Sequence, residues 1–220
     1  MFIVRASRSI GLVAAIGVLS GVQAVAQDDD GRFRDHGPIL YGSAGGFSTF
    51  SDVTNRGLDF NTGYNFGAGV GYQLNRSVAI RANFAFTRAQ LQTSSGTTST
   101  TGPSASVFDG QDFDKYFYGA DLELRYLSHI GLAPYAVLGG GGVTVDPRFP
   151  GMSSFTKPAG KVGAGLGYTF PHSGASLFAE WDGWIYKWDR DTQLLDTVSA
   201  ANNDKTQFDT TWSGGLRFVF

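Results

Sequence analysis

The chain has 220 residues, a formal charge of −2 and no cysteine. The lack of cysteine excludes a disulfide scaffold, a thiolate metal site and a thiol nucleophile. The weak acidity gives no support for nucleic-acid binding, which needs a clustered basic face.

Residues 1–26 are predicted to be a secretory signal peptide. Arg5 and Arg8 supply the positive region, residues 10–19 the apolar core, and a small-x-small pattern ends at the expected cleavage point, Ala26. The apolar run is too short to span a bilayer. The alternative is a retained amino-terminal anchor. Cleavage removes both arginines, changes the formal charge from −2 to −4, and leaves roughly 190 residues, enough for one domain or one small barrel.

Residues 27–37 form a short polar lead-in that we expect to lie in the periplasm, and a barrel domain is predicted over 38–220. Eight stretches of that domain can be strands, most of them with clear period-two alternation. The predicted strands are 38–50, 61–74, 78–93, 113–128, 134–145, 158–170, 175–189 and 206–220. The long connections are 51–60, 94–112, 146–157 and 190–205, and they alternate with the short connections 75–77, 129–133 and 171–174. Short turns on one rim and long loops on the other are typical of outer-membrane barrels.

Charged residues in these strands share one face, opposite the face that carries most of the tyrosines and phenylalanines. The charged set is Arg81, Asp121, Glu123, Arg125, Lys161, Glu180, Asp182 and Arg217. Facing lipid, each Arg or Lys near the midplane would cost about 2–4 kcal/mol. Facing inward, four acids and four bases can pair. Since an eight-stranded barrel is filled by its own side chains, we interpret the set as a structural ion-pair network in the lumen. A gate or ion path is the alternative.

Three strands leave the direction of their faces open. The first and fifth are rich in glycine, so their faces are not assigned. In the seventh, Trp184, Tyr186 and Trp188 share the phase of the charged Glu180 and Asp182. Either a bulge near residue 183 resets that phase, or these aromatics lie near the outer rim.

Two near copies of a glycine motif occupy the second and sixth strands, FGAGVGY at 66–72 and VGAGLGY at 162–168. Their glycines are two apart, which does not fit the dinucleotide pattern G-x-G-x-x-G. We interpret them as small lumen positions that leave room for larger side chains of other strands. With these motifs, residues 38–220 resemble the small eight-stranded outer-membrane barrels typified by the OmpA transmembrane domain and OmpX. The resemblance implies an all-β, antiparallel, up-and-down transmembrane barrel with short periplasmic turns and long extracellular loops.

The last strand ends in an aromatic residue with apolar partners two, four and eight positions earlier. These residues are Trp212, Leu216, Phe218 and Phe220. The pattern resembles the terminal strand that the barrel assembly machinery recognises, so that machinery is an expected partner during biogenesis.

No cofactor, metal site or catalytic residue is predicted. A lipid A-modifying enzyme needs a nucleophile and a base near the outer leaflet, whereas His36, His129 and His172 fall on the short-turn rim. We therefore expect a non-catalytic outer-membrane protein with a role in envelope integrity or in adhesion and recognition through its loops. A narrow gated channel for small solutes or ions is the alternative, and an enzyme is less favoured. Expected partners are outer-membrane lipids, lipopolysaccharide and an extracellular ligand bound by the four long loops.

Overall fold

The computed structural model describes residues 33–49, 58–60, 62–93, 110–148, 154–188 and 205–220. The predicted signal peptide and most of the four long loops lie outside the described residues. The described part contains nine strands and no helix. The strands are β1 Gly37–Thr49, β2 Leu58–Phe60, β3 Gly63–Asn75, β4 Val78–Thr93, β5 Asp112–Arg125, β6 Leu132–Pro147, β7 Phe155–Thr169, β8 Ala175–Trp188 and β9 Lys205–Val219.

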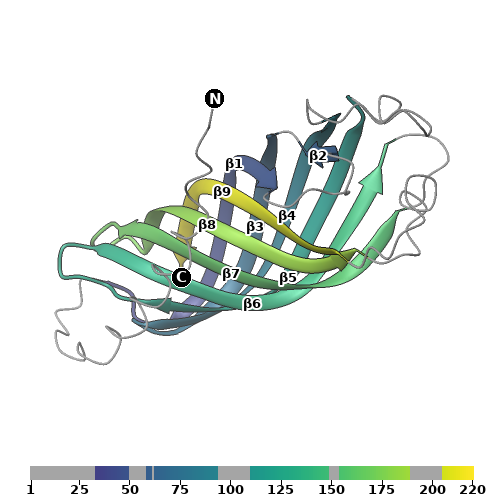
Figure 1. The fold of residues 1–220 in the computed structure, drawn as a ribbon. Helices are drawn as coiled ribbons and strands as arrows, with labels where there is room; N and C mark the ends of the chain where they lie inside the picture. Colours follow the sequence, from purple (N-terminus) through teal and green to yellow (C-terminus); the bar gives the residue numbers. More distant parts are fainter. Residues whose placement is uncertain (1–32, 50–57, 61, 94–109, 149–153, 189–204) are drawn as a thin grey trace, which may run out of the picture.

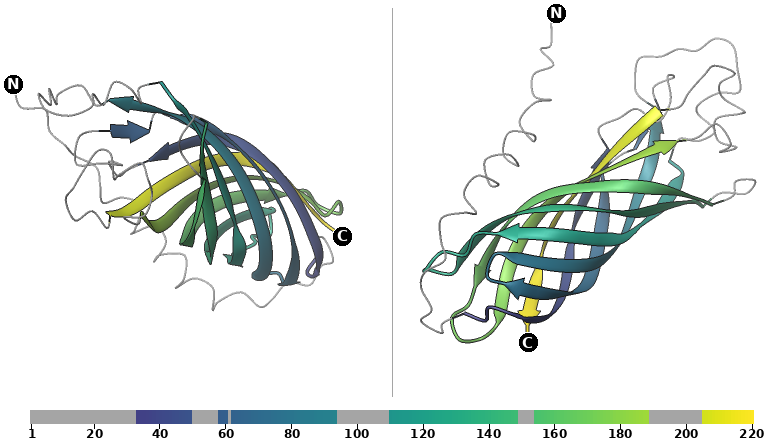
Figure 2. Two further views of the ribbon diagram at one scale, coloured as in Figure 1. Left: turned by 90° about the vertical axis from the view of Figure 1, so that its right-hand side faces the viewer. Right: turned by 90° about the horizontal axis from the view of Figure 1, so that it is seen from below.

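Eight of these strands form a closed antiparallel barrel, as the alternation predicts (Figures 1 and 2). Each strand pairs with its neighbours in the chain, and β1 pairs with β9 to close the cylinder. Closure gives the edge strands partners, which is how a sheet can satisfy its backbone hydrogen bonds within lipid. In the described residues there is no helix long and apolar enough to cross a membrane.

The remaining strand, β2, lies outside the closed barrel and falls in the segment 51–60, which was expected to be a loop. It pairs with the outer end of β4, where Phe60 lies opposite Leu91. Because β4 has 16 residues and β3 only 13, the outer end of β4 extends past its partner. β2 covers that end with a register offset by one residue from β3, an irregularity that period-two alternation does not reveal.

The two faces of the sheet differ as a membrane barrel requires. Large apolar side chains point outward on every one of the eight barrel strands; examples are Leu40, Phe66, Ile80, Leu122, Leu138, Leu166, Leu177 and Leu216. The lumen holds the buried charges and two apolar clusters. The faces that the sequence leaves open are also resolved, because Tyr41 on β1 and Tyr135 on β6 are buried in the lumen while Leu138 is 64% exposed.

The bulge considered near residue 183 is absent. β8 pairs with β9 without a shift from Ala175 opposite Phe218 to Trp188 opposite Lys205. Gly183 has another role: a Cβ there would lie 2.7 Å from the ring of Phe208, so the glycine leaves room for that ring. Trp184 and Tyr186 consequently stay in the lumen phase, where they belong to a buried aromatic cluster.

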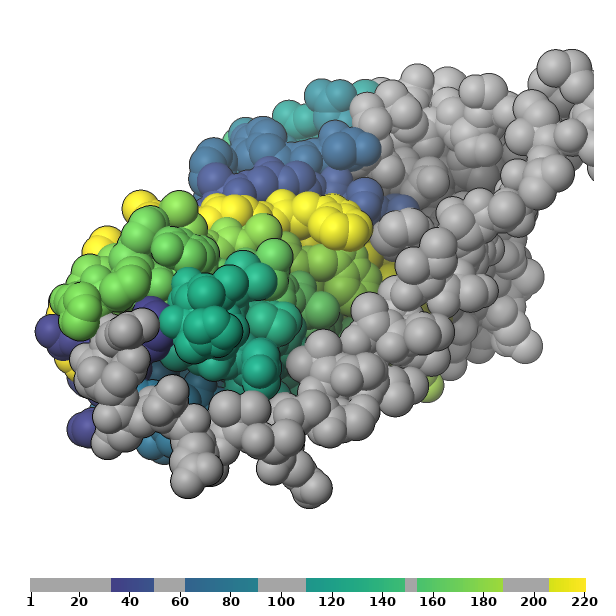
Figure 3. Space-filling model, turned by 90° about the vertical axis from the view of Figure 1, so that its left-hand side faces the viewer, coloured from purple at the N-terminus to yellow at the C-terminus, as the bar shows by residue number. Residues whose placement is uncertain are grey.

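Figure 3 views the end of the barrel that carries the short turns. The turns between β5 and β6 and between β7 and β8 lie next to each other there. All three described short turns are at this end, together with the start of β1 and the last residue, Phe220.

Candidate functional site

Arg81 on β4 lies at the centre of the lumen network and is fully buried. Its Nη1 lies 2.8 Å from Glu180 Oε2 and 3.0 Å from Glu123 Oε2, and its Nη2 lies 3.2 Å from Asp121 Oδ2. One guanidinium therefore joins β4 to carboxylates on β5 and, across the lumen, on β8. Such planar, multidentate contacts are what arginine makes best.

Glu123 on β5 is the matching acidic centre. Arg217 Nη2 and Nη1 donate to its two oxygens at 2.5 and 2.9 Å, and Arg125 Nη2 donates at 2.6 Å. With Arg81 included, three guanidiniums surround one carboxylate that water does not reach. The contacts connect β4, β5 and β9.

Lys161 on β7 completes the network. Its Nζ lies 2.9 Å from Asp121, 3.2 Å from Asp182 and 3.6 Å from Glu180. The structure thus brings together all eight residues that the sequence nominates, four bases and four acids whose formal charges balance. Each of the eight is buried.

Two tyrosines that sequence reasoning missed hold the arginines in place. Tyr41 lies opposite Gly69 and Tyr135 opposite Gly165, and each glycine is the fourth residue of its motif copy. A Cβ on Gly69 would lie 2.4 Å from the Tyr41 ring, and one on Gly165 would lie 2.2 Å from the Tyr135 ring. The glycines therefore form slots for the rings.

Each slotted ring supports an arginine of the network. The guanidinium of Arg81 lies 5.3 Å from the centre of the Tyr41 ring, and that of Arg217 lies 5.6 Å from the Tyr135 ring. These are cation–π distances. The two motif copies thus play the same part for two arginines that both bind Glu123. The sequence does not reveal these tyrosine–glycine pairs, because they depend on the register between neighbouring strands and neither tyrosine could be assigned to a face.

The outer half of the lumen contains a second polar cluster, also missed. Lys115 Nζ and the Tyr186 hydroxyl each donate to Asp209 Oδ2 at 2.7 Å. Gln207 Nε2 donates to the other oxygen of Asp209 at 3.2 Å and to Thr49 Oγ1 at 2.6 Å. Lys115, Gln207 and Asp209 occupy lumen positions of their strands, so extending the charged phase to the strand ends would have found them.

Aromatic side chains separate the two polar groups. Trp184 stacks near Phe117 with ring centres 5.0 Å apart, and Lys161 Nζ of the network lies 5.4 Å from the Trp184 ring. On the outer side, Lys115 Nζ lies 4.9 Å from the ring of Phe47. The lumen is thus layered into an ionic inner half and an aromatic outer half.

A third charged group lies outside the barrel wall, near the loop end. Asp114 accepts from Arg88 Nε at 2.6 Å and from Arg148 Nε at 2.6 Å, and the two arginines bury its carboxylate. Sequence reasoning missed this group because its residues share the phase of the outward aromatics. Its position is consistent with the level at which lipid-facing residues give way to polar surroundings.

The histidines occupy the places expected from the sequence. His129 and His172 lie in short turns, His36 precedes β1, and all three are exposed. Within the described residues, no group of three or more His, Asp or Glu side chains could hold a metal ion. The lumen network can cross-link strands, and each of its four carboxylates forms an ion pair with at least one base.

The residues nominated as the assembly signal lie on the outward face of β9 and just beyond it. All four are exposed; they are Trp212, Leu216, Phe218 and Phe220. Their side chains are therefore available to lipid or to a partner.

Comparison with known proteins points to one family. Residues 11–220 match the family model described as "Outer membrane protein beta-barrel domain". The search of curated proteins found no significant match.

The chain is similar to several solved structures, and two of them, Neisserial surface protein A and OprG, share its fold. Neisserial surface protein A is 16% identical with a TM-score of 0.56, covering 85% of this chain and 100% of that one. OprG from Pseudomonas aeruginosa is 15% identical with a TM-score of 0.50, covering 86% and 97%. Ail, the attachment invasion locus protein of Yersinia pestis, is 20% identical with a TM-score of 0.48, covering 86% and 100%. Because the family model spans nearly the whole chain, this protein belongs to the outer membrane protein β-barrel family and is an outer-membrane protein.

Proposed function

We propose that this protein is a closed, non-catalytic barrel that supports the outer membrane and displays its long loops for adhesion or recognition. The observation that carries the proposal is the set of large side chains buried in the lumen. Eight paired charges occupy its inner half and a buried aromatic cluster its outer half. An eight-stranded barrel is only wide enough to be filled by side chains.

The energetics of the network favour a structural role over transport. Arg81, Glu123 and Lys161 each contact three partners of opposite charge. Removing one partner of a buried pair typically costs about 3–5 kcal/mol, because the other charge is left uncompensated. A permeating ion would have to disrupt several such pairs at once. It would then have to cross the aromatic layer around Trp184.

The alternative is a narrow gated channel, since the same charges line the lumen. Planar-bilayer recordings of the refolded protein distinguish the two. A closed barrel gives no discrete openings, and a matched porin in the same bilayers shows that the assay detects them. Discrete openings by this protein would refute the closed-lumen proposal.

The enzyme alternative is tested by comparing lipid A mass profiles with and without the protein. A change in acyl chains would overturn the non-catalytic assignment.

Three further proposals concern export, assembly and partners. We propose signal-peptide cleavage near Ala26, recognition of the β9 aromatics by the assembly machinery, and contact of the barrel wall with lipopolysaccharide. The exposure of Phe220 and its neighbours on β9 supports the second. Replacing Phe220 by aspartate should lower the outer-membrane level of the protein, whereas replacing it by tryptophan should not. Equal levels of both variants would contradict the assembly role.

The proposed extracellular ligand would bind loops that lie outside the described residues. Binding of intact cells to host or matrix molecules tests this proposal.

A further inference from the structure

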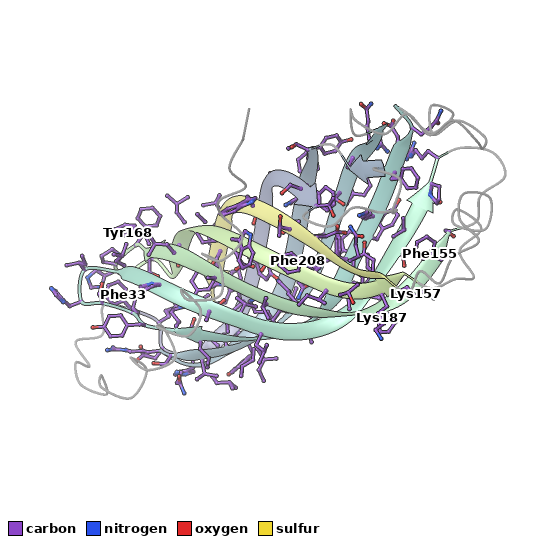
Figure 4. All side chains as sticks on the ribbon, in the orientation of Figure 1. Phe33, Phe155, Lys157, Tyr168, Lys187 and Phe208 are labelled. Atoms are coloured by element: carbon purple, nitrogen blue, oxygen red, sulfur yellow. The ribbon has the colours of Figure 1, made fainter. Side chains whose placement is uncertain are left out.

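Residues 33–36 run along the short-turn end of the barrel just before β1 begins. We refer to these four residues, Phe33 to His36, as the strap. Figure 4 shows Phe33 at that end, far from the labelled side chains Phe155 and Lys157 at the other end. The function proposed above makes no use of the strap.

The strap is bonded to the rim of the lumen through Gln73, near the end of β3. The Gln73 side chain is 2% exposed and points inward. Its Nε2 donates to the carbonyl oxygen of Arg34 at 3.1 Å and to that of Asp35 at 3.4 Å. Asp35 also forms an ion pair with Arg76 in the turn between β3 and β4. These contacts attach the strap to the rim beside the β3–β4 turn.

The strap also reaches the other two short turns. A Cβ placed on Gly131, in the turn between β5 and β6, would lie 3.5 Å from Phe33 Cε1. A Cβ on Gly174, in the turn between β7 and β8, would lie 3.2 Å from Cδ and Nε of Arg34. These turns are distributed around the circumference of the barrel, so a four-residue segment near all three must cross its mouth.

The next residue, Gly37, lets the chain turn from the strap into the wall. It has a φ of +144°, and a Cβ there would lie 2.1 Å from the carbonyl oxygen of Phe220. Only glycine fits this conformation and this space readily. The strap is therefore attached to β1 through a residue that can turn sharply beside the closing seam.

We propose that the strap is an inner lid that seals the periplasmic mouth and keeps water away from the ionic half of the lumen. The lumen inside this mouth holds buried apolar residues of the inner cluster, including Ile39, Ala79 and Val137. The network begins at the same level, because Ala79 and Val137 both lie opposite Glu123 in the sheet. The ion pairs gain from low dielectric surroundings. Opening the lid would hydrate the pairs at that end and make them sensitive to salt.

The protein has no cysteine, so a single introduced thiol can report water entry. Ala79→Cys places it in the lumen directly opposite Gln73, at a position that is 2% exposed. The refolded full chain is treated with a charged, water-soluble thiosulfonate, and the modification rate is measured. The lid is loosened by Phe33→Ser with Asp35→Ser, which removes the ring near Gly131 and the ion pair with Arg76. We expect the rate to rise at least about tenfold, as for a buried group exposed by local opening.

Matched controls separate lid opening from general loosening. Ala89→Cys lies in the buried outer cluster and should stay unreactive in both backgrounds. Ser173→Cys lies in an exposed turn and should react fast in both. His36→Ser changes an exposed strap residue and should leave the Ala79→Cys rate unchanged.

Two results would overturn the proposal: fast modification of Ala79→Cys with the native strap, or the same slow rate after the strap is loosened. Folding is checked by the mobility of unheated samples in electrophoresis. If the strap variant does not fold, Gln73→Leu removes the two lid hydrogen bonds at similar volume, and the same rise in rate is required of it. Because the closed-lumen proposal is tested by conductance, failure of the lid leaves that test unaffected.

Discussion

The inner and outer halves of the lumen both bury polar side chains, but they stabilise them in different ways. The inner half packs four bases and four acids into one network, in which single groups contact three partners. Among the described residues, the outer half holds the buried ion pair of Lys115 with Asp209, surrounded by aromatic rings and hydroxyl or amide donors. The inner half therefore depends on charge balance, whereas the outer half depends on packing. Substitutions in the two halves should therefore lower the free energy of unfolding by different amounts, and different second substitutions should compensate for them.

The largest loss is expected from Glu123→Leu. It leaves three guanidiniums, those of Arg81, Arg125 and Arg217, without their shared carboxylate. We expect the free energy of unfolding to fall by about 3–5 kcal/mol. Urea unfolding of the refolded protein in detergent or bilayers measures this. A change below 1 kcal/mol, roughly that of an exposed pair, would indicate that the network is hydrated.

Arg217→Leu should cost somewhat less, on the order of 3 kcal/mol, because Glu123 keeps Arg81 and Arg125. The double variant Glu123→Leu with Arg217→Leu should be less destabilised than the sum of the single variants, since residues in direct contact couple. Strict additivity in this double-mutant cycle would argue against direct pairing.

In the outer half, Lys115→Met should cost about 2 kcal/mol. Asp209 retains donors from Tyr186 and Gln207, and the methionine fills much of the space under Phe47. The same unfolding experiment measures the loss. A loss as large as that of Glu123→Leu would show that charge balance governs both halves.

The smallest effect tests the glycine slots. Gly165→Ala introduces a Cβ that would lie 2.2 Å from the Tyr135 ring and 2.7 Å from the carbonyl oxygen of Ala179. The ring and the neighbouring strand must therefore shift, at about 1–3 kcal/mol for overpacking. Gly160→Ala in the same strand is the matched control, because its Cβ would meet nothing within 4 Å. If the two variants had the same midpoint of urea unfolding, the slot would not position the ring.

The sequence is sufficient for much of this architecture because lumen and lipid impose opposite residue types on alternate positions. The charges at Arg81, Asp121 and Lys161 reveal the lumen phase directly. The slots of Tyr41 and Tyr135 are not predictable in this way. Their strands carry glycine in both phases, and the tyrosine–glycine pairs depend on register between strands.

Two other features were missed for physical reasons as well. Trp184 looked misplaced because alternation alone cannot distinguish a lipid-facing aromatic from one in a lumen whose outer half is apolar. The strap has no periodicity, and its bonds to Gln73 use backbone carbonyls, which leave no trace in the residue types of residues 34 and 35.

Apolar residues of the sheet face lipid while the charged phase faces the lumen, and this orientation underlies both the network and the closed barrel. Trp212 and Trp184 test it most directly, because Trp212 is exposed on the outward face and Trp184 is buried in the lumen phase. Two variants are made, one with Trp212 and one with Trp184 as the single tryptophan of the chain. Each is reconstituted into bilayers with nitroxide-labelled lipid, and the quenching of tryptophan fluorescence is compared. We expect strong quenching of Trp212 and little of Trp184. Stronger quenching of Trp184 would contradict the account.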